Sequence, residues 1–105
     1  MVSQTLLDEI RRRLVDQFCP QRIILFGSQA RGTADDHSDV DLLVICKVTD
    51  RKHQMLEMDR ALRGLGIARD IVVMTPEEFE RDRLICGTVA RPAFTEGVQL
   101  YAVPA

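Results

Sequence analysis

A chain of 105 residues falls within the size range of one compact domain and is too short for two. Hydrophobic residues make up 46% of it and charged residues 29%, which is typical of globular rather than disordered, fibrous or membrane-spanning proteins. With 14 basic and 16 acidic residues the formal charge is −2, so the chain lacks the broad positive field of nonspecific nucleic-acid binders. We expect a single domain over residues 1–105 without general nucleic-acid binding.

The three cysteines, Cys19, Cys46 and Cys86, are too widely separated for a zinc site or a disulfide framework. We therefore expect reduced, mostly buried thiols. The first seven residues do not combine a basic leader with a long apolar run, and no stretch reaches membrane-spanning length. These features favour a cytoplasmic protein without a membrane partner.

The first part of the chain predicts one helix and two strands. The apolar positions at helical spacing are Leu7, Ile10, Leu14 and Phe18. Ser3 or Thr5 is suited to cap this helix, and Pro20 stops its pattern. Two β-branched and apolar runs, at 22–26 and 40–46, predict strands on either side of a polar connection.

A second helix is predicted from Thr49 to about Leu65, with Gly64 and Gly66 at its exit. Its apolar stripe consists of Met55, Met58, Leu62 and Leu65. The next β-rich run, at 69–74, follows this helical crossover, so we expect it to lie parallel to the strand at 40–46.

The remainder predicts a third helix and a final strand. Thr75 as cap, Pro76 in the first turn and Glu78 reaching back form the helix start. The chain is then expected to turn at Arg91 and Pro92, before a last strand near the C-terminus. That strand, at 98–103, has no neighbour that the sequence identifies. These elements predict an α/β (α+β) fold with a short mixed β-sheet packed against helices.

Two carboxylates open the second strand. Asp39 and Asp41 are two residues apart, so in an extended strand both project from one face, about 7 Å apart along the chain. Repulsion would raise the pKa of one of them unless a cation lay between them. Mg²⁺ suits such a site, because it binds through oxygen to one or two carboxylates together with substrate phosphates.

A turn suited to phosphate stands across the connection. Gly27 allows the backbone close to a ligand, and Ser28 begins a helical turn, at 28–31, with free N–H groups. If the first strand ends where the second begins, the two strands are antiparallel, and phosphates on this turn lie beside Asp39 and Asp41.

A third acid, Asp70, stands at the start of the strand at 69–74. In a strand parallel to the one at 40–46, Asp70 lies level with Asp41. The sequence therefore predicts three carboxylates beside one phosphate-binding turn.

The combined pattern of Gly-Ser, ten residues and Asp-x-Asp resembles the signature of the polymerase-β-like nucleotidyltransferase superfamily. The residues that carry it are Phe26, Gly27, Ser28, Gln29, Ala30, Arg31 and Gly32, followed by Ser38, Asp39, Val40, Asp41 and Leu42. The chain is similar in particular to minimal nucleotidyltransferases, which are about this long and often act with a separate helical partner of the HEPN type. The similarity runs over nearly the whole chain, including Asp70 and the segment 96–101.

The resemblance implies a role for each matching residue. Gly27 and Ser28 hold the β- and γ-phosphates of a nucleoside triphosphate, ATP being the expected substrate. Asp39 and Asp41 coordinate two Mg²⁺ ions, and Asp70 shares the ion on the nucleophile's side. Two such ions stabilise the attacking and leaving oxygens of an in-line displacement at the α-phosphorus.

Two residues keep open roles at this stage. Arg31 is placed to reach a phosphate, or equally to pair with Asp35 or Asp36. Asp70 is a candidate to accept the acceptor's proton, although metal coordination can lower the hydroxyl's pKa enough to make a base unnecessary. The oxygen ligands do not distinguish Mg²⁺ from Mn²⁺.

The resemblance implies an antitoxin that transfers AMP from ATP to a tyrosine of a HEPN-type partner. One alternative is nucleotidylation of a small-molecule alcohol with a partner subunit. Another is a non-catalytic module that neutralises its partner by contact alone. Because larger nucleotidyltransferases use a further domain to bind base and acceptor, we expect a homo- or hetero-oligomer in which another subunit supplies that surface.

Overall fold

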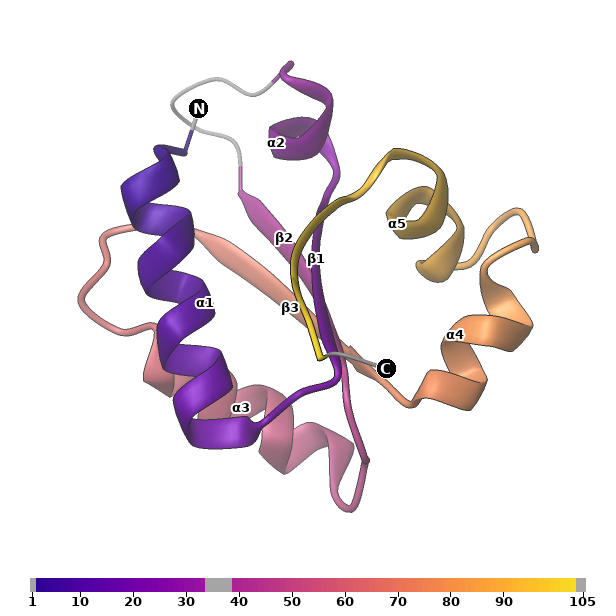
Figure 1. Cartoon of the computed structure of the whole chain (residues 1–105), viewed down its shortest axis with the longest axis horizontal. Coiled ribbons are helices and arrows are strands. Elements are labelled where there is room, and N and C mark those ends of the chain that lie inside the picture. The colour runs from indigo at the N-terminus through magenta and orange to yellow at the C-terminus, as the bar shows by residue number, and fades with distance from the viewer. Residues whose placement is uncertain (1, 34–38, 104–105) are drawn as a thin grey trace.

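A four-stranded sheet with helices on both faces forms the protein (Figure 1). The computed structural model describes residues 2–33 and 39–103. Its elements in chain order are α1 (Gln4–Phe18), β1 (Arg22–Phe26), α2 (Ser28–Arg31), β2 (Val40–Ile45), α3 (Arg51–Ala61), β3 (Arg69–Met74), α4 (Pro76–Asp82), α5 (Ala90–Glu96) and β4 (Val98–Ala102). The expected fold of a short mixed sheet packed against helices is confirmed.

The strand order is β3-β2-β1-β4. β1 pairs antiparallel with both β2 and β4, whereas β2 and β3 are parallel. The parallel pair is joined through α3, which supplies the long crossover that parallel neighbours require. The predicted orientations of the first three strands are therefore confirmed, and the last strand finds its neighbour in β1.

Alternation along the strands divides the core into two layers. In the first layer, Ile23 of β1 and Leu42 of β2 pack against α1 and α3. These two helices contribute Ile10 and Met58, among other residues. The next residues along each strand face the layer of α4 and α5. That second layer consists of Ile24, Leu43, Ile45, Phe79, Ala90 and Ala93. Figure 1 shows α1 and α3 on one face and α4 and α5 on the other.

Side-chain N-caps stabilise the starts of α1 and α4. Ser3, one of the two expected caps of α1, accepts a hydrogen bond from the Leu6 N–H at 3.2 Å. At α4 the predicted capping box is confirmed: Thr75 Oγ1 accepts from the Glu78 N–H at 3.1 Å, and Glu78 Oε1 accepts from the Thr75 N–H at 2.9 Å. These bonds satisfy amides of the first turn that have no intrahelical acceptor.

The second predicted helix is shorter than expected. α3 begins after Asp50, whose carboxylate accepts from the His53 N–H at 3.1 Å, so this aspartate and not Thr49 is the cap. The helix ends at Ala61, four residues before Leu65. β2 likewise ends at Ile45, one residue before the predicted end.

The predicted turn at Arg91 and Pro92 is wrong, because both residues lie in α5. Pro92 is the third residue of that helix, where an N–H would have no intrahelical acceptor, so a proline there removes no hydrogen bond of the helix.

The expectation of mostly buried thiols is also wrong in part: all three cysteines are free, but only Cys46 is buried, while Cys19 and Cys86 are exposed. Within residues 2–33 and 39–103, no helix is long and apolar enough to cross a membrane.

Candidate functional site

The sheet register brings the predicted acidic residues to one end of the sheet. Asp41, the second residue of β2, lies opposite Phe26 of β1 and directly beside Asp70, the second residue of β3. Asp39 precedes β2 by one residue and is exposed. Because strand side chains alternate, Asp41 and Asp70 share the face of the sheet that α4 and α5 cover. The structure therefore places Asp70 level with Asp41, as the parallel crossover predicted.

Gly27 connects β1 to α2 and lies directly against the Asp41 carboxylate. Its φ of +74° lies in the region that L side chains rarely adopt. A Cβ atom at this position would overlap Asp41 Oδ2 and come within 3.2 Å of Asp41 Cγ. The turn and the carboxylate can approach this closely only because residue 27 is a glycine.

The turn that follows Gly27 is a single helical turn. The N–H groups of Ala30 and Arg31 donate to the Gly27 carbonyl, each at 3.1 Å, and Gly32 ends α2 in the left-handed conformation. Ser28 is the first residue of α2 and is half-buried. Its N–H has no intrahelical acceptor because of its position, which makes it available to an anion beside Asp41.

The environment of Asp41 disfavours its charge. Burial raises the pKa of Asp41, and the negative charges of Asp70 and then Asp39 raise it further, while Arg31 opposes the shift. The three carboxylates therefore interact electrostatically, as the sequence predicted for anions that lack a cation between them. A bound cation would relieve the repulsion among them.

The donor atoms of this end of the sheet fit a hard divalent cation. Among residues 2–33 and 39–103, no three His, Cys, Asp or Glu side chains converge closely enough to hold a metal ion as a protein-only cage. Mg²⁺ is seldom bound by such cages, because it usually keeps several waters and takes one or two carboxylates together with substrate phosphates. The open carboxylate set beside Gly27 is of this second kind, and its role as metal ligand stays a prediction.

Arg31 pairs with Glu96, a residue that no sequence motif links to it. Its Nη1 lies 3.3 Å from Glu96 Oε2 of α5, and both side chains are about half exposed, at 46% and 47%. The expected alternatives, Asp35 and Asp36, lie outside the described residues. Sixty-five positions separate Arg31 from Glu96, so no local pattern marks the pair.

A second contact of α2 was also missed. Gln29 is 7% exposed, and its Oε1 accepts a hydrogen bond from the Val2 N–H at 3.0 Å. Gln29 belongs to the Gly-Ser motif, but nothing in its spacing indicates that it faces the start of the chain. Both missed contacts join α2 to segments that are distant in sequence.

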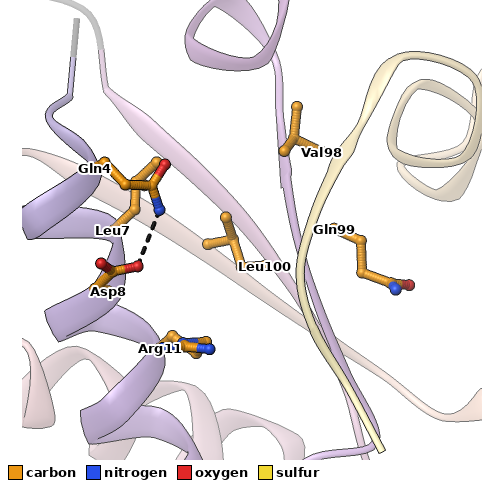
Figure 2. Close-up of a pocket in the computed structure, with 7 residues that line it drawn as sticks. All are labelled: Gln4, Leu7, Asp8, Arg11, Val98, Gln99 and Leu100. Carbon is orange, nitrogen blue, oxygen red and sulfur yellow. Dashed lines mark hydrogen bonds between the residues drawn. The ribbon is translucent and has the colours of Figure 1, made fainter.

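A groove elsewhere on the molecule contains none of the predicted site residues. Figure 2 shows it between α1 and β4, with Leu7 and Leu100 facing one another across it. Its volume is about 200 Å³. Asp8 and Arg11 are its charged residues, and the Asp8 carboxylate already accepts a hydrogen bond from Gln4 at 2.9 Å. The candidate site is therefore the end of the sheet around Gly27 and Asp41.

The fold is that of a nucleotidyltransferase domain. The family model described as "Nucleotidyltransferase domain" matches residues 7–96, and the chain belongs to that family. The resemblance expected from the Gly-Ser and Asp-x-Asp motifs is thereby confirmed.

Among curated proteins, the chain is 35% identical to the candidate protein adenylyltransferase MJ1305 of Methanocaldococcus jannaschii. The match covers 78% of this chain and 63% of the relative, so the chain spans less than two thirds of that protein's length.

Solved structures support the same fold. A toxin–antitoxin with AMP-PNP superposes with a TM-score of 0.69 at 24% identity, covering 92% of this chain and 73% of that one. A candidate nucleotidyltransferase from Sulfolobus solfataricus gives 0.65 at 24% identity, covering 93% and 78%. A complex of a tri-AMPylated HEPN toxin of Shewanella oneidensis with an MNT antitoxin gives 0.62 at 22% identity, covering 95% and 72%.

The charge of Asp41 is expected to destabilise the metal-free protein. Because its pKa is raised on folding, the ionised carboxylate costs stability at pH 7, and that cost vanishes as the pH falls below the unfolded pKa of about 3.9. Asp41→Asn should therefore raise the Tm at pH 7 in chelator-treated buffer and lose that advantage as the pH falls below about 4. Differential scanning calorimetry across pH measures both effects.

Asp16→Asn is the control, because Asp16 lies on α1 with 62% of its side chain exposed. We expect its stability to stay within about 0.5 kcal/mol of wild type. A fall in Tm for Asp41→Asn at pH 7 would show that the carboxylate stabilises the fold even without a cation.

Gly27→Ala is expected to weaken ATP binding at least about tenfold, because its methyl group must displace the Asp41 carboxylate. Gly32→Ala is the matched control: its φ is also positive, at +76°, but a Cβ there meets nothing within 4 Å. The control has only the backbone strain of roughly 1–2 kcal/mol. Titration calorimetry with ATP and Mg²⁺ measures the affinities, and equal losses in both variants would mean that strain alone accounts for the effect.

Proposed function

We propose that this chain transfers AMP from ATP to a tyrosine hydroxyl of a HEPN-type protein partner and so acts as its antitoxin. The observation that carries the proposal is the contact of Gly27 with the Asp41 carboxylate. It joins a turn suited to phosphate to a carboxylate suited to a metal ion, which is the pairing that an enzyme of nucleoside triphosphates needs.

In the proposed reaction the acceptor oxygen forms a bond to the α-phosphorus of ATP, and the bond from that phosphorus to the bridging oxygen of the β-phosphate breaks. Pyrophosphate leaves, and the hydroxyl proton passes to solvent or to Asp70. Gly27 and Ser28 hold the β- and γ-phosphates in line with the acceptor. Two Mg²⁺ ions, held by Asp39, Asp41 and Asp70, would neutralise the charge that develops on the attacking and leaving oxygens.

The partner is proposed from two kinds of support. The structural relatives include a toxin–antitoxin with AMP-PNP and a tri-AMPylated HEPN toxin in complex with an MNT antitoxin. In this chain, the three predicted acids lie at an open end of the sheet, with Asp39 and Asp70 exposed. A partner protein can therefore bring a tyrosine hydroxyl directly to these exposed carboxylates.

The test is transfer of label from α-labelled ATP to a HEPN-type protein in the presence of Mg²⁺. We expect label on a tyrosine of the partner, located by mass spectrometry. In the Asp39→Asn/Asp41→Asn variant, transfer should fall at least about a hundredfold, since even the loss of groups that only orient metal ligands costs roughly 10–100-fold.

Different failures of this test have different meanings. ATP binding without label on the partner would favour a small-molecule alcohol as acceptor. Partner binding without any ATP binding would leave a module that neutralises by contact alone. Equal labelling by wild type and the double variant would remove the aspartates from the mechanism.

Arg31 is expected to exchange Glu96 for the triphosphate when ATP binds. Because the ion pair is half exposed, breaking it costs at most about 1 kcal/mol. Glu96→Gln should therefore tighten ATP binding by up to about fivefold, since no carboxylate then competes for the guanidinium. Titration calorimetry measures the change, and weaker binding would show that Glu96 instead holds Arg31 in its binding position.

A further inference from the structure

The turn formed by Gly27 and α2, called the phosphate turn below, depends on contacts with other parts of the molecule. α2 contains four residues, and its N-cap, Gly27, has no side chain to bond the first-turn amides. A helix this short is unstable on its own, because nucleating one turn costs more than its few hydrogen bonds return. Something else in the molecule must therefore keep α2 in place beside Asp41.

Gln29 is the residue of α2 that is anchored in the interior. Among the described residues it is the only polar or charged residue that is buried, at 7% exposure. A buried amide is costly unless it is hydrogen-bonded, so its partners fix its orientation. One of them is the backbone N–H of Val2, at 3.0 Å.

The segment that Gln29 contacts is itself firmly attached. Val2 packs against the core layer of α1 and α3, and the next residue, Ser3, caps α1. α1 is held in that layer by Ile10 and Leu14, both of which are 0% exposed. Figure 1 shows the start of α1 and α2 at the same end of the molecule. Successive contacts thus connect the core, through α1 and Val2, to the phosphate turn.

We propose that Gln29 is a positioning residue that holds the Gly27–Ser28 turn against Asp41 through its hydrogen bond to the Val2 backbone. The affinity for ATP then depends on the segment before α1, because that segment fixes the position of α2. The identity of the ligand rests on the function proposed above, whereas the fixing of α2 does not.

A double-mutant cycle tests the contact. Gln29→Met removes the acceptor while keeping a side chain of similar length, and Val2→Pro removes the donor N–H. Val2→Ala keeps the N–H and controls for the lost packing of the valine. Each of the first two variants should raise the Kd for ATP with Mg²⁺ by about two- to tenfold, and the combined variant should bind no worse than the weaker of them.

A readout that needs no ligand accompanies the cycle. The amides of Ala30 and Arg31 donate to the Gly27 carbonyl, so their hydrogen exchange reports whether the turn is formed. In the ligand-free protein, Gln29→Met and Val2→Pro should speed this exchange about two- to tenfold, and Val2→Ala should not.

Gln54→Met is the matched control for a merely structural glutamine. Gln54 accepts from the Thr49 N–H at 3.1 Å and donates to the Lys47 carbonyl at 3.0 Å, beyond the other end of β2. Its loss should lower the Tm and leave both the Kd for ATP and the exchange of α2 unchanged.

The outcomes separate this inference from the proposed function. Unchanged exchange of α2 in Gln29→Met, or additive losses in the combined variant, would overturn the positioning role. A wild-type protein that does not bind ATP would overturn the proposed function, and the exchange measurement would still decide whether Gln29 fixes the turn.

Discussion

The contact between Gly27 and the Asp41 carboxylate is the constraint on which the rest of the site depends. It leaves no space for a side chain at residue 27. The backbone of Gly27 and the Asp41 carboxylate therefore lie directly side by side at this end of the sheet. Such an approach needs β1 and β2 to be antiparallel neighbours in one register, because only then does the end of β1 meet the start of β2. The layers of helices on both faces of the sheet keep that register fixed, since a slip of one residue would turn every core side chain of β2 to the other face.

The same arrangement works against the stability of the metal-free protein. The sheet aligns Asp41 with Asp70 and leaves Asp39 close by, so that burial and repulsion raise the pKa of Asp41. An apolar residue at position 41 would avoid this electrostatic and desolvation cost. Placing like charges together is useful only where a ligand of opposite charge compensates for them, which is why perturbed carboxylates are typical of functional sites.

Local patterns were sufficient to predict most of the elements and the acidic part of the site. The strands at 22–26 and 69–74 have the predicted bounds, because each is a short apolar run between clear breaks. The alignment of Asp41 with Asp70 followed from a rule of topology, that a helical crossover makes strands parallel. α5 could not be predicted because it has only seven residues and contains Pro92, and a proline in a short segment is typical of a turn.

Contacts between distant segments could not be predicted in this way. Gln29 meets Val2 across 27 positions, and Arg31 meets Glu96 across 65. Neither pair leaves a periodic pattern, because each depends on how completed elements pack. β1 was likewise identified as the neighbour of β4 only in the structure, since a sheet edge accepts any strand with a suitable apolar face.

The two long-range contacts of α2 also have a consequence for biosynthesis. During translation, at roughly 5–20 residues per second, the segment around Val2 emerges several seconds before Glu96. The nascent chain can form α1 early, but β3 and α5 must follow before Asp70 and Glu96 take their places. Because non-local contacts form late and slowly, the contacts of α2 should be complete only after β3 and α5 have been synthesised and most of the sheet has assembled.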